Sequence, residues 1–548
     1  MTLGAFDTHE VLNQPPPYPG RNLFAGDPLL KALVRPGTEA DGGDELMRAG
    51  QFWGSPEAHE MARLANEFTP VLKTHDSQGR RADVVEYHPA YHALMRRSVD
   101  GGLTSAIWTN GGSNEGHKHL ARAGRFYVTA QTEAGHLCPI TMTSASLAGL
   151  RAEPELFKQW AAGVANRKYD QRFLPAEAKQ GVLLGMGMTE KQGGTDVRAN
   201  TTAAKDLGDG TFSVTGHKWF MSAPMSDAFL ILAQSDGGLT CFLLPRFRPD
   251  GSINGIRIQR LKNKLGNRSN ASSEAEFHDA LAFQVGETGK GVRTIIQMVT
   301  LTRLDCAVAS AGLMRAAVAR AVHHATHRRV FDTALIDAPL MLRTLADLSL
   351  DTAAATALAL RLAKAFDSAA TDPAEAAYAR LITPAAKYWV CKSAPSVIYE
   401  AMECLGGNGY VEDADIARIY REAPVNAIWE GSGNVMCLDV LRVVSQDFDV
   451  LDKVTTLLAG DLGSSGPVSV DVLRVAAKTC AADEGAARIL TEQLALTAAA
   501  AALRQAFPGP IADAFVETRL GGQWRSTYGM LDARFDAKAI VTTAYPAG

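Results

Sequence analysis

Apolar residues recur along the first third of the chain at the spacing of helices. Between Asp44 and Lys179 they return every three to four positions, as Met61, Leu64 and Phe68 do. This spacing gives each helix one face that can be buried. We therefore predict a helical N-terminal domain over residues 1–180.

The spacing changes in the middle of the chain. Phe212 and Val214 alternate with polar residues, and apolar runs follow at 229–232 and 240–244. Alternation with a period of two, bounded by turn residues, is typical of β-strands. We predict a barrel-like central domain of antiparallel strands over residues 181–285.

Helical spacing then returns in three long stretches, at 295–329, 340–368 and 374–404. Stretches of this length are typical of helical bundles. We predict a C-terminal helical bundle over residues 286–445.

A Gly/Ser/Pro-rich break at 463–467 precedes an Ala-rich helical segment at 470–505. We predict a separate helical extension over residues 446–548. The expected fold class is α+β and mostly α, with a helical domain, an antiparallel β domain, a helical bundle and an extra C-terminal helical domain.

Composition narrows the function classes. With 548 residues, 46% of them hydrophobic and 21% charged, the chain is typical of a soluble protein with several domains. A net charge of -4 gives no general attraction to nucleic acids or anionic membranes. Apolar runs such as 494–503 are too short to cross a bilayer, so we expect no membrane span.

Cysteine use and the N-terminal segment point to a cytoplasmic protein. The seven cysteines are scattered without the spacing of a metal site, which suits a reducing compartment, and we expect no metal. No basic residue precedes Arg21, which argues against a secretory signal.

Three motifs could carry chemistry, and the first is Met-Gly-Met-Thr-Glu-Lys-Gln-Gly-Gly-Thr-Asp at 186–196. Its paired glycines allow a planar or phosphorylated ligand to approach the main chain, and Thr189 and Thr195 supply hydroxyl groups. Taken alone, such a segment is more often a simple turn.

The second motif, at 216–222, places Trp219 and Phe220 two or three residues before Ser222. Aromatic rings beside a hydroxyl could pack on a ring system. Taken alone, the pattern more often marks core residues at the end of a strand.

The third motif combines Leu-Gly-Gly-Asn-Gly-Tyr at 405–410 with Ile-Trp-Glu-Gly-Ser-Gly-Asn at 428–434. Glu430 lies between Trp429 and Gly431, and an apolar neighbour can raise a carboxyl pKa toward that of a general base. A lone glutamate in a glycine-rich loop is otherwise usually part of a helix cap.

Together, in this order across a helix-strand-helix pattern, the three motifs resemble the acyl-CoA dehydrogenase family. The resemblance covers roughly 181–442 and leaves the last hundred or so residues outside. Within the family, the chain looks like the AidB-like branch of alkylation-response flavoproteins. The marks of that branch are the segments 138–143, 188–194 and 429–434 and the C-terminal extension.

The resemblance implies FAD as the cofactor. Thr189 and Thr195 would contact the flavin ring and its pyrophosphate side, Phe220 would pack on the isoalloxazine, and Ser222 would reach flavin N5. Arg328 would meet the pyrophosphate of FAD in a neighbouring subunit. The implied cofactor-binding residues are Met186, Met188, Thr189, Gly194, Thr195, Phe220, Met221, Ser222, Arg328, Gly406, Gly407, Trp429, Gly431, Ser432 and Asn434.

The resemblance also implies a mechanism, in which Glu430 removes the α-proton of an acyl-CoA thioester while the β-hydrogen leaves as hydride to flavin N5. Some relatives carry the base at the position of Thr302, and threonine cannot serve. Arg303 would orient the carboxylate. Glu403 and Asp332 depart from the family pattern near the pyrophosphate and weaken the case for the inter-subunit part of the site.

Finally, the resemblance implies a homotetramer, built as a dimer of dimers, that binds double-stranded DNA during alkylation stress. From residue 446 onward the chain carries nine basic and twelve acidic residues, a net charge of -3, which is not typical of DNA-binding segments. A folded face could still gather Arg442, Arg519, Arg525 and Arg534. A helical oligomerisation module, a purely metabolic acyl-CoA dehydrogenase and a flavin oxidase remain open alternatives, and the sequence leaves the electron acceptor unknown.

Overall fold

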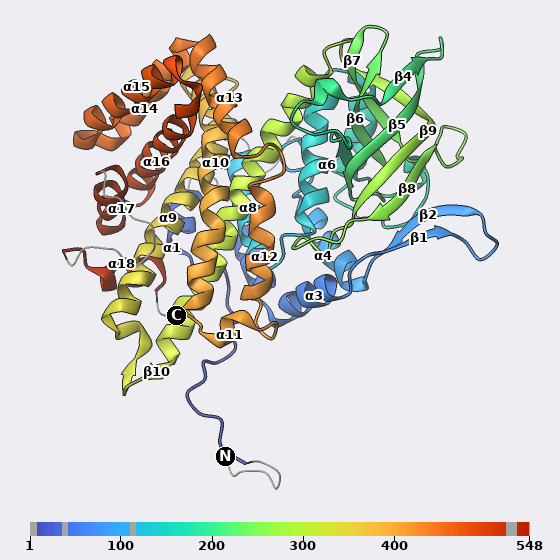
Figure 1. Ribbon diagram of the computed structural model, residues 1–548. Coiled ribbons are helices and arrows are strands. Elements are labelled where there is room, and N and C mark those ends of the chain that lie inside the picture. The colour runs from blue at the N-terminus through green and yellow to red at the C-terminus, as the bar shows by residue number, and fades with distance from the viewer. Residues whose placement is uncertain (1–7, 35–41, 110–116, 522–533, 547–548) are drawn as a thin grey trace.

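The computed structural model describes residues 8–34, 42–109, 117–521 and 534–546. Figure 1 shows a central bundle of long helices, with a β domain against one side and a layer of later helices against the other. The predicted fold class is confirmed in this arrangement.

The N-terminal part is helical, as predicted, and its helices are α1 (Pro28–Val34), α2 (Gly42–Trp53), α3 (Pro56–Glu67), α4 (Pro89–Asp100), α5 (Lys118–Ala130), α6 (Leu137–Leu150) and α7 (Pro154–Ala165). It also contains an antiparallel hairpin that the periodicity does not predict, β1 (Val71–His75) with β2 (Arg81–Glu86). Asp76 closes its turn, because the Oδ1 atom accepts from the main-chain N–H groups of Gln78 and Arg80.

The β domain has seven strands, β3 (Leu184–Gly187), β4 (Ala203–Asp206), β5 (Thr211–Ser222), β6 (Ala228–Ser235), β7 (Gly238–Pro245), β8 (Ile256–Leu261) and β9 (Ser272–Val285). Six of them follow the order β3-β6-β4-β5-β9-β7, and β8 pairs with β9 off this path. β7 also pairs with β6, which closes the sheet on itself. The prediction of purely antiparallel strands is wrong in part. Both β3 and β4 pair with β6 in parallel. The β3–β6 pair is parallel because β3 enters the sheet from the helical domain at the end where β6 begins.

The bundle is built on α8 (Gly291–His327), α9 (Pro339–Ser368) and α10 (Pro373–Glu403), close to the predicted spans. Shorter helices follow, α11 (Gly407–Tyr410), α12 (Ile416–Asn426) and α13 (Gly433–Gln446). The hairpin of β10 (Arg329–Val330) and β11 (Thr333–Ala334) joins α8 to α9. At its tip Asp332 has a φ of 60°, the left-handed conformation in which glycine is the usual residue.

The C-terminal extension forms α14 (Phe448–Leu462), α15 (Gly466–Ala482), α16 (Ala487–Ala506), α17 (Pro510–Phe515) and α18 (Ala537–Ala544). The helical segment expected over 470–505 is divided between α15 and α16, because the Asp483 carboxylate accepts from the N–H of Gly485 and starts a turn. The extension does not form a hydrophobic core of its own. Its buried alanines and leucines belong to the same apolar cluster as α8, α9 and α10.

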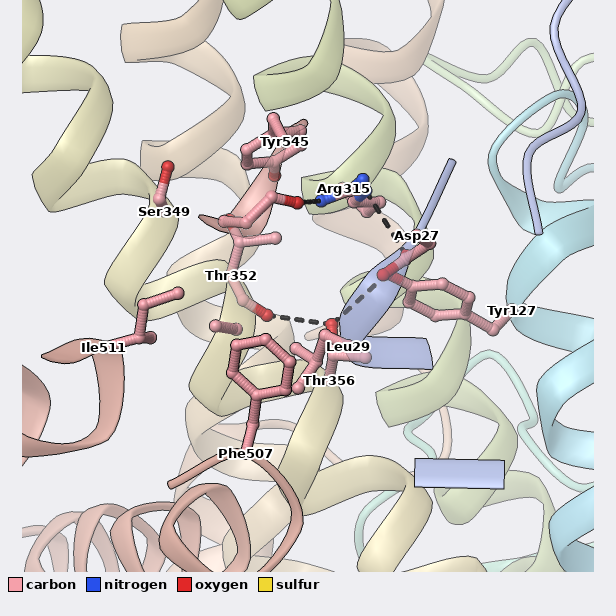
Figure 2. A pocket seen from close by; sticks show the side chains of 12 residues that line it. Asp27, Leu29, Tyr127, Arg315, Ser349, Thr352, Thr356, Phe507, Ile511 and Tyr545 are labelled. Atoms are coloured by element: carbon pink, nitrogen blue, oxygen red, sulfur yellow. Dashed lines mark hydrogen bonds and ion pairs between the residues drawn. The ribbon is translucent and has the colours of Figure 1, made fainter. Parts of the chain in front are cut away.

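Asp27, just before α1, and Tyr545, just after α18, meet at Arg315 of α8, as Figure 2 shows. The Arg315 guanidinium pairs with Asp27 at 3.3 Å, donates to the Ala544 carbonyl at 2.6 Å, and lies 3.7 Å from the ring centroid of Tyr545. The cavity beside them is only about 10 Å³, about the space of one water molecule, so this junction is packed rather than open.

Candidate active site

Glu430 lies in the short connection between α12 and α13. It adopts a left-handed conformation with a φ of 59°, and Gly431 follows with a φ of 104°. A non-glycine residue held in this region costs on the order of 1–3 kcal/mol and persists only where neighbouring groups fix it. The contacts of the loop supply that restraint.

Three consecutive carbonyl groups around Glu430 are hydrogen-bonded to buried cations. Arg303 of α8 donates from Nε to the carbonyl oxygen of Glu430 at 3.0 Å. Lys387 of α10 donates from Nζ to the carbonyl oxygen of Trp429 at 2.8 Å and also to that of Gly431. The main chain of the base candidate is therefore tied to two helices.

The carboxylate of Glu430 is held separately, by Thr302 of α8. The Thr302 hydroxyl donates to Oε2 at 2.7 Å. Burial raises the pKa of Glu430, while the hydrogen bond from Thr302 and the positive charges of Arg303 and Lys387 oppose that rise. The result is a carboxylate more basic than an ordinary glutamate.

Arg303 does not orient the carboxylate in the way we expected. Its Nε bonds to the Glu430 main chain, and its Nη1 pairs with Asp439 at 2.8 Å. The expectation is corrected, because the guanidinium acts on the loop and the hydroxyl of Thr302 holds the carboxylate.

The first two motifs lie side by side in the β domain. The main-chain N–H of Trp219 donates to the carbonyl of Thr189 at 2.8 Å, and Gly187 packs against Lys218 and Met221. A Cβ atom on Gly194 would stand 2.4 Å from Oγ1 of Thr189, so a larger residue there would require the Thr189 side chain or the loop to shift.

The side chains of β5 alternate across the sheet at the end of the strand. Phe220 is 49% exposed and Ser222 is half-buried, whereas Met221 is fully buried in the core of the sheet. Phe220 and Ser222 therefore share an accessible face. The side chain of Met221 points away, which leaves only its main chain for the predicted cofactor contact.

The loop of Glu430 packs against the β domain, since Trp429 lies on the same apolar cluster as Met186 and Met188. Ser222 and Glu430 both affect the pKa of the buried Cys138 thiol at the start of α6. Burial raises the pKa of that thiol to about 12, a hydrogen bond with Ser222 lowers it, and the charge of Glu430 raises it. The sequence marked Cys138 only as part of a branch motif.

Several predicted cofactor residues are far from Glu430 within one chain. Arg328 follows the end of α8, 26 residues after Thr302, which corresponds to about 39 Å of helix. Gly406 and Gly407 follow the end of α10 at Glu403, which lies 16 residues, or about 24 Å of helix, beyond Lys387. One chain alone does not bring these residues to the base candidate.

Other residues predicted to bind the cofactor already form hydrogen bonds within the protein. Arg328 donates from Nη1 to the carbonyl of Asn13 at 2.6 Å. Oδ1 of Asn434 accepts two hydrogen bonds from Arg488 of α16, at 2.9 and 2.7 Å, so its amide nitrogen is the group left for a ligand. Glu403 and Asp332 are exposed at the far end of the bundle and can point away from a phosphate.

The two arginines predicted to bind DNA differ sharply. Arg442 is 55% exposed. Arg519 is buried, with its guanidinium 2.5 Å from Asp347 and 2.9 Å from Asp351 of α9. The expectation that Arg519 contacts DNA is wrong for this fold, because its charge is used inside the protein. Arg534 pairs with Glu517 at 2.7 Å, and Arg525 lies outside the described residues.

The described residues also hold a larger cavity, of about 250 Å³, next to the site. It lies between the β1–β2 hairpin, α4 and the turn after Ser222, and its rings are those of Tyr87, Tyr91, His92, Tyr169 and Phe173. No group of three metal-ligating side chains occurs in the described part of the chain. Across the same ranges, none of the helices combines the length and apolar character needed to cross a membrane.

Three family models match the chain in order along its length. They are the adaptive response protein AidB N-terminal domain at residues 13–171, the acyl-CoA dehydrogenase middle domain at 185–280 and the acyl-CoA dehydrogenase C-terminal domain at 289–445. AidB of Escherichia coli (strain K12) is 45% identical over 517 residues, which cover 94% of this chain and 95% of that protein. The chain belongs to the acyl-CoA dehydrogenase family, in its AidB branch.

Further relatives agree with this membership. Acyl-CoA dehydrogenase family member 11 of Caenorhabditis elegans is 33% identical over 448 residues, 78% of this chain and 72% of that protein. Two solved structures each give a TM-score of 0.82. The match to Bd2924 in its apo form, at 26% identity, covers 90% of this chain and 99% of that chain. The match to ACDH-11 of C. elegans in complex with C11-CoA, at 25% identity, covers 99% of this chain and 93% of that chain.

Membership confirms the predicted family, its cofactor FAD and its enzyme class, an FAD-dependent acyl-CoA dehydrogenase. The sequence did not identify Lys387, although a lysine in the apolar helical run Ala-Ala-Lys-Tyr-Trp-Val was a signal that its charge has a buried partner.

Proposed function

We propose that this chain catalyses the α,β-dehydrogenation of acyl-CoA thioesters with Glu430 as the base. The observation that carries the proposal is the environment of the Glu430 carboxylate. Its carboxylate is bonded to Thr302, its pKa is raised by burial, and its neighbour Trp429 packs on the same apolar cluster as Met186 and Met188 of the first motif. The bound C11-CoA in ACDH-11 supports a thioester as the ligand class.

The residues on the accessible face of the β domain fit a flavin. Phe220 offers a half-exposed ring for packing on a planar system, and Ser222 offers a hydroxyl two residues away on the same face. Thr189, Gly194 and Thr195 form the adjoining loop. FAD, when bound there, accepts the hydride that leaves the β-carbon of the substrate.

The groups of the chain itself have separable roles. Glu430 takes the α-proton, and its raised pKa makes it a stronger acceptor for a weakly acidic C–H bond. Thr302 holds Oε2, which leaves Oε1 to face the substrate. Arg303 and Lys387 keep the loop in its left-handed conformation and act as positioning residues.

We propose that Met186, Met188, Trp429, Gly431, Ser432 and Asn434 complete the near side of the flavin site. Arg328, Gly406 and Gly407 would serve the FAD of a neighbouring subunit, since about 39 Å of helix separates Arg328 from Thr302. That division requires at least a dimer and is compatible with a homotetramer. The seven cysteines, all free and buried, are consistent with a cytoplasmic location.

A second proposed function is binding of double-stranded DNA as part of the alkylation response. It is supported by the identity with AidB and by the exposed Arg442 at the boundary of the extension. Arg519 is not included, because it is buried.

One experiment separates these functions. The purified protein is tested for a flavin spectrum, titrated anaerobically with acyl-CoA esters, and compared with Glu430→Gln. Substrate-dependent bleaching in the wild type alone supports the dehydrogenase, and a wild type without flavin contradicts it. Oxygen consumption with turnover would support an oxidase instead. Duplex binding that weakens with salt and is reduced in Arg442→Ala supports the DNA role.

A further inference from the structure

Lys264 lies close to the end of the strand that carries Ser222 and is connected to it through Ser272. Lys264 follows β8, and its Nζ donates to the carbonyl of Asn270 at 2.7 Å, to Oγ of Ser272 at 2.9 Å and to Oδ1 of Asn267 at 3.4 Å. An ammonium group has three N–H donors and no lone pair, so Lys264 is the donor in all three bonds.

Ser272 connects this lysine to the candidate flavin site. It is the first residue of β9 and stands opposite Ser222 at the end of β5. The two hydroxyl oxygens are 3.0 Å apart. Because Ser272 accepts from Lys264, its own hydrogen is available for Ser222, and Ser222 can then donate either to the Cys138 thiol or to a ligand on the accessible face. Successive hydrogen bonds of one direction polarise one another.

Burial and the neighbouring carboxylates act in opposite directions on the pKa of Lys264. Burial lowers the pKa of Lys264 to about 8, against the carboxylates of Glu422 and Glu133, which raise it. At neutral pH the ammonium is therefore mostly protonated. Glu422 is fixed nearby, since it accepts from the main-chain N–H of Asn267 at 2.5 Å and from its side-chain amide at 2.8 Å.

We propose that Lys264 is a positioning residue that acts through Ser272 to hold Ser222 as a hydrogen-bond donor toward the electron-accepting group. This inference rests on the proposed function, which puts the flavin against Ser222. Hydride uptake gives the reduced cofactor one more negative charge than the oxidised form. A donor backed by a buried cation favours that charge, so Lys264 raises the reduction potential of bound FAD.

The test is the midpoint potential of the bound flavin, measured by equilibration with a reference dye in the full-length protein. Lys264→Met is expected to lower the reduced-to-oxidised ratio at fixed potential about tenfold, or about 30 mV for a two-electron couple. Ser272→Ala should change it in the same direction. The double variant should match Lys264→Met alone, because both changes break one chain of bonds. Lys205→Met, at an exposed lysine of β4, should leave the potential unchanged.

Each other outcome overturns a distinct claim. A fully flavin-loaded Lys264→Met with an unchanged potential overturns the inference. Additive effects of the two substitutions would show a charge acting through space and overturn the role of Ser272. If Lys264→Met does not retain FAD, Ser272→Ala decides alone, since it keeps the charge and removes one hydroxyl. A wild type that binds no flavin overturns the proposed function itself.

Discussion

Thr302 of α8 donates a 2.7 Å hydrogen bond from Oγ1 to Oε2 of Glu430, across 128 positions of sequence. The bond favours the ionised carboxylate and so opposes the rise in the pKa of Glu430 that burial causes. A base must be deprotonated before it can accept a proton, and Thr302 thereby extends the pH range in which Glu430 can act.

Thr302→Val is therefore expected to raise the pKa of Glu430 and to move the acid limb of kcat to higher pH. The substitution keeps the shape of the side chain and replaces the hydroxyl by a methyl group, which cannot donate. The measurement is kcat against pH with a saturating acyl-CoA ester. Thr300→Val is the control, because the Thr300 hydroxyl bonds to Ile296 of its own helix. An acid limb that stays in place in Thr302→Val contradicts the prediction.

Lys387→Met should lower both stability and kcat. Lys387 is buried and bonds to the carbonyls of Trp429 and Gly431, and a buried carbonyl without a partner costs about 1–3 kcal/mol. The left-handed conformation of Glu430 loses part of its restraint at the same time. Urea unfolding and steady-state kinetics measure the two effects.

The matched control for this change is Lys364→Met, at an exposed lysine of the neighbouring helix α9. It should leave both quantities near the wild-type values. If Lys387→Met behaves like the control, the two carbonyls do not depend on the lysine, and the positioning role assigned to it is wrong.

Substitutions of Arg519 and Arg442 should distinguish a loss of stability from a loss of DNA binding. Arg519→Ala removes the guanidinium shared by two buried carboxylates, Asp347 and Asp351, and should cost about 3–5 kcal/mol of stability. Arg442→Ala changes an exposed side chain and should unfold like the wild type. Thermal unfolding and duplex binding, both measured on each variant, provide the test. Normal stability in Arg519→Ala contradicts the buried ion pairs.

Sequence periodicity predicted the long elements and missed the short ones. The helices α8, α9 and α10 carry many turns of regular spacing, and the structure places them within a few residues of the expected spans. The β1–β2 hairpin was not predicted, since its five- and six-residue strands lie between helices and show too few alternations to separate them from a helix. The turn at Asp483 depends on one side-chain bond inside an otherwise helical composition.

The site was predictable only where its residues are neighbours in sequence. Glu430 stands out through its glycine-rich setting, and its role stays a prediction. Lys387 lies more than forty positions from the carbonyls that it binds, and the contact partners of Arg519 lie in α9. No local pattern encodes such pairings, because they are made by tertiary packing. For the same reason the sequence suggested an exposed Arg519 where the structure has a buried one.

Glu133 should make the stability of the protein depend on pH in the acid range. Burial alone would raise the pKa of Glu133, but hydrogen bonds from His136 and Asn66 outweigh it and lower the pKa to about 2. In the unfolded chain the same group titrates near 4.5. Between these values the unfolded state binds more protons than the native state, so stability is lost as the pH falls from about 4.5 toward 2.

The wild type should lose roughly 3 kcal/mol over that interval from this one carboxyl group, at 1.36 kcal/mol for each pKa unit. Glu133→Gln cannot titrate, so its stability should be lower at neutral pH and should fall less steeply below pH 4.5. Urea unfolding at several pH values compares the slopes. Glu57→Gln, at an exposed glutamate of α3, should keep the wild-type slope. Equal slopes in the wild type and Glu133→Gln would mean that the hydrogen bonds at Glu133 do not favour its charged form, and the lowered pKa would be wrong.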